Sequence, residues 1–157
     1  VEESVLRIVE LRQDIRLNLS RFFPPATGST AGQAMKQLGK TRFVTVGHVC
    51  IHAFGDCEDK YQRISTKVMQ IFWPGVYRDM QKMGQILSGS DLNWTLVRAC
   101  PGRNGKARQA EKECGISMDG SQFRPGYSNK ALAEFLYEAA ANQQMYSRKM
   151  PIFYREG

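Results

Sequence analysis

Short uncharged runs of β-branched and aromatic residues recur along the chain, and they predict buried strands. Residues 43–46 (Phe-Val-Thr-Val) and residues 94–97 (Trp-Thr-Leu-Val) contain no charge, glycine or proline, which is typical of buried strands. Residues 150–154 predict a closing strand. Residues 15–19, Ile-Arg-Leu-Asn-Leu, alternate between apolar and polar positions, as a half-buried or edge strand does.

Helices are predicted between these strands wherever apolar residues recur at spacings of three and four. The longest covers residues 66–88, and its regular part is expected to begin at Pro74, because proline fits only the first turn of a helix. A later helix over residues 129–141 follows Ser128, whose hydroxyl can cap its first turn. The apolar stripe of the long helix consists of Phe72, Val76, Met80, Met83 and Leu87.

Two further helices and two loops complete the pattern. Residues 1–11 are amphipathic, and residues 31–38 predict a helix that ends at Gly39. Residues 49–67 and 103–124 keep no steady period, so we expect loops there. Helices and strands therefore alternate along the chain, which predicts an α/β fold, a parallel sheet with flanking helices.

The loops that follow the strands are the expected place for a ligand. The strand over residues 94–97 is followed closely by Pro101 and Gly102, which break extended structure. Ligands of parallel sheets bind just beyond the carboxyl ends of the strands. Any ligand site is therefore expected at residues 47–53 and 98–108.

The composition is that of an ordinary globular protein. The chain has 157 residues, 42% hydrophobic and 24% charged, which fits a single domain over residues 1–157 with a substantial core. It contains no apolar run long enough to span a membrane and no signal peptide. Because it begins with Val1, we expect a processed chain or a fragment. Its four cysteines form no C-x-x-C pair, so we expect free thiols in a reducing intracellular compartment, cytoplasmic or organellar.

A net charge of +7 raises the question of an anionic partner. Scattered Lys and Arg residues make a solvated surface the simplest interpretation, and a phosphate-bearing partner, an NADP-like cofactor or a nucleic acid, is the alternative. The densest basic cluster lies at residues 98–112. Because this cluster falls in one of the expected ligand loops, a small anionic ligand is favoured over a nucleic acid.

Four motifs occur in an order typical of one enzyme family. They are KTRFVTV at residues 40–46, YRDM at 77–80, SDLNWTLVR at 90–98 and YSNKALAEF at 127–135. Together they resemble the atypical short-chain dehydrogenases/reductases, the NAD(P)-binding branch that includes NmrA-like proteins and flavin reductase/biliverdin reductase B. The resemblance implies a Rossmann-like domain, NAD(P) as cofactor, and hydride transfer to a small carbonyl, flavin or tetrapyrrole-type substrate.

The amino-terminal signature of that family is missing from this sequence. The family opens with a strand and a Gly-rich turn whose glycines let the backbone approach the pyrophosphate. Here Gly28, Gly32 and Gly39 stand in a different context. The resemblance therefore implies a Rossmann-like sheet truncated at its amino-terminal side, with on the order of 60 residues absent upstream.

The motifs also depart from the family at positions near its active site. After the strand over residues 43–46 the family has a serine, where this sequence has Gly47 and His48. Gly84 stands where the family's first helix motif has an acidic residue. Its Tyr-x-x-x-Lys pattern would place Tyr77 before a lysine, but Gln81 stands there and Lys82 comes one position late. Ala131 stands where the family's later helix motif has an acidic residue. Ala99 and Cys100 follow Arg98 where the family has two prolines, and Pro101 comes later than expected.

These positions supply the candidate site residues. His48 and Tyr77 are the candidate catalytic groups, a hydrogen-bond donor to a carbonyl or flavin and a phenolic acid. No metal site is assigned, although His48, Cys50, His52, Asp56 and Cys57 lie close enough in sequence for a zinc site to be an alternative. The candidate cofactor-binding residues are Gly47, His48, Arg98, Ala99, Cys100 and Pro101.

Each candidate also has a purely structural interpretation. Tyr77 would then be a residue at the helix surface or the edge of the core. Arg98 would form an ion pair rather than bind a phosphate or carboxylate. Cys100 would be a buried, unreactive thiol rather than one of low pKa.

Two other functions stay open beside the reductase. The chain could be a non-catalytic remnant of the fold that serves as a structural or interaction subunit. A missing front half would expose an edge of the strand that runs from Ile15 to Leu19, and exposed edges recruit protein partners. Nucleic-acid binding through residues 98–112 is the third and weakest hypothesis.

Overall fold

The structure is a computed structural model that describes residues 34–35, 37–57, 59–100 and 113–156. The helix predicted over residues 1–11, the strand over residues 15–19 and Pro101 lie outside the described residues. The helices are α3 (Lys60–Phe72), α4 (Pro74–Ser88), α5 (Asn129–Ala141) and α6 (Gln143–Tyr146). The strands are β1 (Arg42–His48), β2 (Asn93–Ala99), β3 (Cys114–Ser117) and β4 (Ile152–Arg155).

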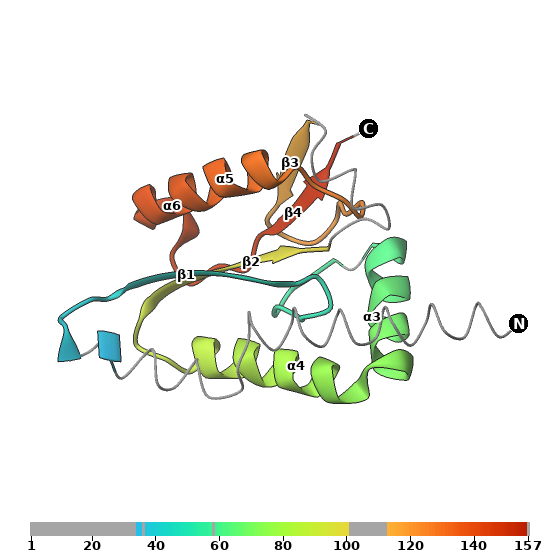
Figure 1. Cartoon of the computed structure of the whole chain (residues 1–157), viewed down its shortest axis with the longest axis horizontal. Helices are drawn as coiled ribbons and strands as arrows, with labels where there is room; N and C mark the ends of the chain where they lie inside the picture. Colours follow the sequence, from blue (N-terminus) through green and yellow to red (C-terminus); the bar gives the residue numbers. More distant parts are fainter. Residues whose placement is uncertain (1–33, 36, 58, 101–112, 157) are drawn as a thin grey trace, which may run out of the picture.

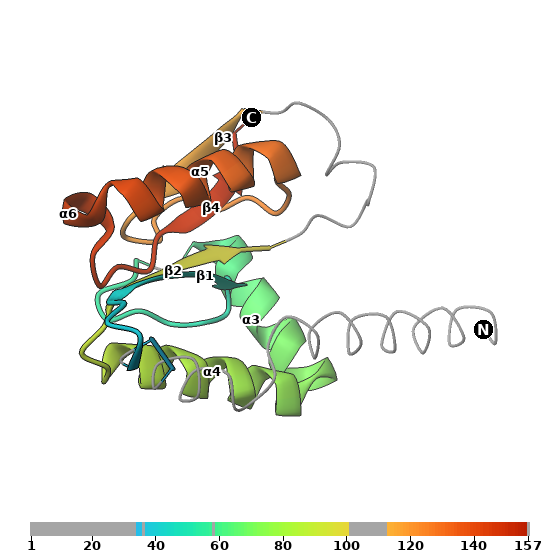
Figure 2. The ribbon, with the colours of Figure 1, turned by 60° about the vertical axis from the view of Figure 1, so that its left-hand side comes forward.

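The described strands form one sheet in the order β1-β2-β4-β3, with helices on both faces. Figures 1 and 2 show α3 and α4 on one side of the sheet and α5 and α6 on the other. The predicted fold class, a mainly parallel Rossmann-like sheet with flanking helices, is confirmed. No helix within the described ranges is long and apolar enough to cross a bilayer.

The prediction of a parallel sheet depends mainly on strands β1 and β2. Phe43 lies opposite Trp94 and Val46 opposite Val97, and the two strands run in the same direction. Both predicted strands are therefore correct, each slightly longer than the uncharged run that identified it. β2 is buried along almost its whole length, because helices cover both of its faces.

Alternate residues of β2 contribute to two separate cores. Trp94 and Leu96 pack on the α4 side, with Met80 and Leu87. Val97 and Ala99 pack on the α5 side, in a cluster that includes Leu132, Phe135, Tyr146 and Phe153. This division follows from strand geometry, because successive side chains point to opposite faces of a sheet.

Arg42 connects β1, β2 and α5 at the start of the sheet. Its Nη1 donates to the carbonyl and to Oδ1 of Asn93, both at 3.1 Å. Its Nη2 donates to Oγ1 of Thr95 at 2.7 Å and also to the carbonyl of Ala139. These hydrogen bonds of the Arg42 guanidinium align β1 with β2 and hold α5 against both strands.

The predicted long helix over residues 66–88 is in fact two helices. α3 ends at Phe72, Trp73 lies between them in a non-helical conformation, and α4 begins at Pro74 as expected. α3 starts at Lys60, inside the stretch expected to be irregular, and Asp59 caps it by accepting from the Tyr61 N–H at 2.7 Å. The apolar residues of α3 recur at helical spacing (Tyr61, Ile64, Val68 and Ile71) but are exposed, and its buried residues include the polar Gln62 and Thr66.

The second expected loop, residues 103–124, contains a short strand. β3 pairs antiparallel with β4, with Gly115 opposite Tyr154 and Ser117 opposite Ile152. With four residues, one of them glycine, β3 has too little apolar alternation to be recognised from sequence. The sheet is therefore parallel over β1, β2 and β4 and antiparallel at β3.

Local signals of helix ends were reliable. α5 has the predicted bounds, and the Ser128 hydroxyl accepts from the Ala131 N–H at 3.4 Å. Gly39 has a φ of +64°, the left-handed conformation that glycine adopts at a helix end. The closing strand also exists, as β4. These features depend on neighbouring residues only, which is why the sequence reveals them.

Candidate functional site

The carboxyl ends of β1 and β2 bring most of the predicted cofactor-binding residues together. Gly47 lies opposite Arg98, and His48 lies opposite Ala99. Cys100 follows directly after β2. Their assignment to cofactor binding stays a prediction, but the parallel register places them side by side at the edge where such folds bind ligands.

His48 is held in one tautomer by the turn that follows β1. Its Nδ1 accepts a hydrogen bond from the Cys50 N–H at 3.2 Å, so the imidazole hydrogen is on Nε2. Burial lowers its pKa from 6.5 to about 4. At neutral pH His48 is therefore an uncharged ring with one N–H that can donate to a ligand.

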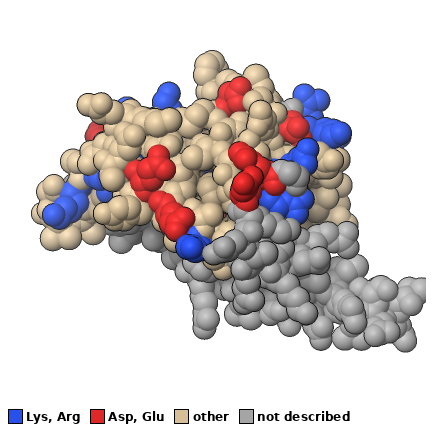
Figure 3. Space-filling view, turned by 90° about the horizontal axis from the view of Figure 1, so that it is seen from above, with Lys and Arg blue, Asp and Glu red and all other residues tan. Residues whose placement is uncertain are grey.

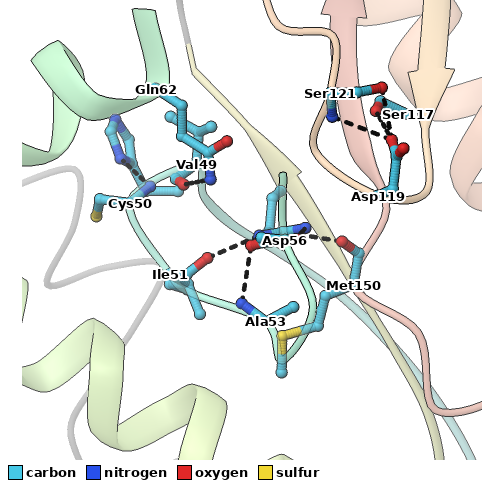
Figure 4. Close-up of polar contacts among 12 residues, drawn as sticks. Val49, Cys50, Ile51, Ala53, Asp56, Gln62, Ser117, Asp119, Ser121 and Met150 are labelled. Carbon is cyan, nitrogen blue, oxygen red and sulfur yellow. Dashed lines mark hydrogen bonds and ion pairs between the residues drawn. The ribbon is translucent and has the colours of Figure 1, made fainter. Parts of the chain in front are cut away.

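The guanidinium of Arg98 is fully buried and holds the loop after β1. Its Nε donates to the carbonyl of Met150 at 2.7 Å, and its Nη1 donates to the carbonyl of Ile51 at 2.9 Å. Both terminal nitrogens also bind the Asp56 carboxylate, Nη2 at 2.8 Å and Nη1 more closely. Asp56 also accepts from the Ala53 N–H at 2.9 Å, a contact that Figure 4 shows.

This network gives Arg98 a structural role. The ion-pair interpretation describes its observed contacts, since a bidentate carboxylate and two carbonyls surround the group. The sequence analysis considered its partner, Asp56, only as a possible metal ligand. A usable signal was present, because an arginine within a buried strand requires a carboxylate nearby.

The Ile51 side chain lies beside Gly47 and Gly84, two positions at which the sequence departs from the family motifs. A Cβ added to Gly47 would lie 2.8 Å from Cδ1 of Ile51, and a Cβ added to Gly84 would lie 2.9 Å from its Cγ2. The Ile51 side chain, fully buried, therefore fills space between β1 and α4 that is available only because both positions are glycine. A side chain at either glycine would force the Ile51 side chain to shift.

Tyr77 lies half-buried on α4 and packs against the core on that side of the sheet. Gln81, one turn later, donates from Nε2 to the Cys50 carbonyl at 2.6 Å. The position that holds lysine in the Tyr-x-x-x-Lys pattern is thus used to hold the turn after β1. No hydrogen bond joins Tyr77 to His48 within the described part of the chain, so a joint catalytic role stays a prediction.

None of the four cysteines, all at described positions, forms a disulfide. Burial, together with the nearby Cys100, raises the pKa of Cys50 to about 12, and its Sγ contacts Sδ of Met80 at 3.6 Å. Cys50 is therefore a protonated core residue. Across the described ranges no three His, Cys, Asp or Glu side chains converge as metal ligands would.

Charge on the visible surface is mixed. Figure 3 shows acidic and basic side chains together on the face seen from above, without a field of one sign. This face agrees with the solvated-surface interpretation of the positive net charge.

Comparison with known proteins supports the resemblance. A sequence model of a family described as NAD(P)H-binding matches residues 20–143. No curated protein matches the chain. Two solved structures do: a short-chain dehydrogenase/reductase from Veillonella parvula DSM 2008, in ethylated form (TM-score 0.65), and the wild-type protein of that organism in complex with NADP (TM-score 0.60).

The two structural matches establish the fold. Each shares 14% sequence identity with this chain, and each match covers 85% of this chain but 59% of the solved one. The described sheet and helices thus correspond to part of a short-chain dehydrogenase/reductase structure. The NADP in the second structure belongs to that protein.

Removing the carboxylate that pairs with Arg98 should destabilise the protein strongly. Asp56→Ala is expected to lower the free energy of unfolding by about 3–5 kcal/mol in urea denaturation, because it leaves a buried guanidinium unpaired. Asp79→Ala, on the exposed side of α4, is the control and should change it by less than about 0.5 kcal/mol. Equal effects of the two variants would contradict the role assigned to the pair.

The depressed pKa of His48 predicts a specific pH dependence of stability. Between pH 6.5 and pH 4 the unfolded chain binds a proton at His48 that the folded chain does not, so stability falls as the pH falls. From pH 7 to pH 5 the wild type should lose about 2 kcal/mol more than His48→Gln. His52→Gln, which removes the other histidine, should lose as much as the wild type.

Gly84 and Ile51 should be energetically coupled. Gly84→Ala forces a Cβ against Ile51 and is expected to cost about 1–3 kcal/mol of unfolding free energy. Adding Ile51→Leu, which removes the Cγ2 branch that the new Cβ would meet, should make the double variant more stable than the sum of the single effects by about 0.5–2 kcal/mol. Strict additivity in a double-mutant cycle would show that the two residues do not share this space.

Proposed function

The chain belongs to the NAD(P)H-binding family, and on that premise we propose that it is the carboxyl-side part of a short-chain dehydrogenase/reductase-like enzyme. Its substrate would be a small carbonyl, flavin or tetrapyrrole-type molecule. The observation that carries this proposal is the parallel pairing of β1 and β2. Their carboxyl ends lie side by side at Gly47, His48, Arg98 and Ala99.

The residues at this edge fit the nicotinamide end of the cofactor. The proposed contacts are Gly47, His48, Ala99, Cys100 and Pro101, with Arg98 acting through the loop that it holds. The uncharged imidazole of His48 suits an uncharged ring and its amide. NAD(P)H supplies a hydride when bound, and the protein supplies position and electrostatics.

The phosphates require other groups. The sequence has no Gly-rich turn of the family type, and the Arg98 guanidinium is occupied by Asp56 and two carbonyls. Basic residues are frequent at positions 103–112 of the sequence, outside the described residues. Recognition of the diphosphate through that stretch is part of the proposal.

His48 would act on the substrate as a hydrogen-bond donor. Its Nε2–H can bind a carbonyl oxygen and stabilise the negative charge that grows there during reduction. Because its pKa is about 4, the ring donates this hydrogen bond at neutral pH without serving as a cationic acid. The proton for the product oxygen would then come from Tyr77 or from water.

A non-catalytic subunit is the second candidate, and a specific observation favours it. Ile51 fills the space beside Gly47 and Gly84 where the family carries polar side chains, and Gln81 is bonded to the loop. A site filled in this way suits a protein that keeps the fold for binding or assembly. The reductase is expected to bind NADPH or NADH and the non-catalytic subunit is not, so a binding measurement distinguishes the two candidates.

Calorimetric titration of the protein with NADPH and with NADH tests the proposed reductase function. We expect saturable binding with a Kd on the order of micromolar, as is usual for such ligands. With a carbonyl substrate, His48→Ala should lower kcat/KM by about 100-fold, because a single donor to the developing oxyanion is lost. His48→Gln, which keeps an N–H donor, should recover part of the activity.

The pH profile provides a further check on the same assignment. The His48-dependent part of kcat/KM should be constant between pH 6 and pH 8, since the ring is already neutral there. An absence of NADPH and NADH binding at millimolar concentration would contradict the reductase and favour the non-catalytic subunit.

A further inference from the structure

A stripe of apolar side chains along α3 is exposed to solvent. Five of them are between 41% and 72% exposed: Tyr61, Ile64, Val68, Ile71 and Phe72. Their spacing places them within about 100° of the helix circumference, so they form one continuous surface, called here the α3 stripe. Single exposed apolar residues are ordinary, but a continuous exposed apolar surface marks an interaction site.

The described part of the fold does not use the α3 stripe. The residues that α3 buries are Gln62, Thr66 and Met69, which lie on another side of the helix. Of these, Met69 alone belongs to a hydrophobic core of the described residues. A surface helix normally buries its apolar face and exposes its polar one. α3 does the reverse, so packing within the described residues does not account for the stripe.

Basic side chains line one long edge of the α3 stripe. Lys60, Arg63 and Lys67 are exposed and follow one another at spacings of three and four, which makes them neighbours on the helix surface. Nζ of Lys60 lies 5.1 Å from the centre of the Tyr61 ring, so the charge adjoins the apolar surface directly. α3 itself contains no acidic residue. Glu58 and Asp59 precede it in the sequence, and Asp59 is its cap.

This arrangement of charge is unfavourable for the helix itself. Arg63 neighbours both Lys60 and Lys67, and like charges at these spacings repel. The helix dipole also disfavours cations near the amino-terminal end, where Lys60 and Arg63 lie. An anionic partner seated on the α3 stripe would relieve both effects.

The combination fits a lipid surface better than a second copy of the chain. Helices that lie in a membrane interface place apolar and aromatic side chains in the acyl region, and lysine and arginine beside them reach the phosphates. Tyr61, near one end of the stripe, has the amphipathic ring that suits this boundary. A second copy of α3 would offer no carboxylate to the basic edge, and like charges brought together across an interface oppose binding.

We propose that the α3 stripe is a docking surface for an anionic phospholipid bilayer. The five apolar side chains enter the boundary between headgroups and acyl chains, and Lys60, Arg63 and Lys67 bind the headgroup phosphates. Attachment of this kind is peripheral, with α3 parallel to the bilayer surface. The proposal does not depend on the reductase, because none of its residues belongs to the proposed cofactor site.

Co-sedimentation of the full chain with vesicles tests the proposal. We expect saturable binding to vesicles of equal parts phosphatidylcholine and phosphatidylserine, and binding about tenfold weaker to phosphatidylcholine alone. Binding should also weaken as sodium chloride is added, because salt screens the attraction. Absence of binding to the mixed vesicles, or equal binding to the two compositions, would overturn the proposal.

A pair of double variants tests the apolar part of the surface. Ile64→Gln with Ile71→Gln should weaken binding to the mixed vesicles by at least about tenfold, because two side chains no longer enter the apolar region. Tyr137→Gln with Met145→Gln removes two exposed apolar side chains on the other side of the sheet and should bind as the wild type does. All these positions are exposed, so the variants should keep the fold, which circular dichroism checks.

A matched pair tests the basic edge. Lys60→Gln with Lys67→Gln should weaken binding about 20-fold, whereas Lys130→Gln with Lys149→Gln, which removes two exposed lysines outside α3, should change it less than about twofold. Equal effects within either matched pair would contradict docking through α3. A dimer that Ile64→Gln with Ile71→Gln dissociates, in a protein that binds no vesicles, would assign the stripe to a second copy instead.

Discussion

The buried ion pair between Arg98 and Asp56 holds the loop after β1 against β2, and the rest of the structure around the strand ends depends on it. The pair joins β2 to the loop that follows β1, and the same guanidinium binds the carbonyls of Ile51 and Met150. An arginine that is fully buried is stable only when its donors are satisfied. Here the requirement determines the path of the loop back across the sheet.

The path of that loop decides what lies at the carboxyl end of β2. There the turn after β1 orients His48 through the Cys50 N–H and is itself held by Gln81. The ion pair thus supports the loop next to the proposed cofactor site.

The same loop explains how this chain can keep a short-chain dehydrogenase/reductase fold with altered site residues. Ile51 enters the core between Gly47 and Gly84, and its fit depends on the absence of side chains at both. Gly47 and Gly84 therefore both leave room for the same side chain.

Sequence alone determined the elements whose cause is local or strongly periodic. Uncharged runs identified β1 and β2, Pro74 marked the start of α4, and Ser128 marked the start of α5. The order of these elements predicted the parallel sheet, and the motifs predicted the NAD(P)H-binding family. For the candidate site, sequence predicted which residues follow the two strands, and the register places Gly47 and His48 beside Arg98 and Ala99.

Only the tertiary structure decided the partners of those residues. β3 has only four residues and depends on pairing with β4. α3 buries the polar Gln62 and Thr66, a face that the spacing of its apolar residues does not reveal. The pairing of Arg98 with Asp56 depends on a contact between residues 42 positions apart in the sequence. Such contacts leave no period or spacing, since they arise only when the loop folds back on the sheet.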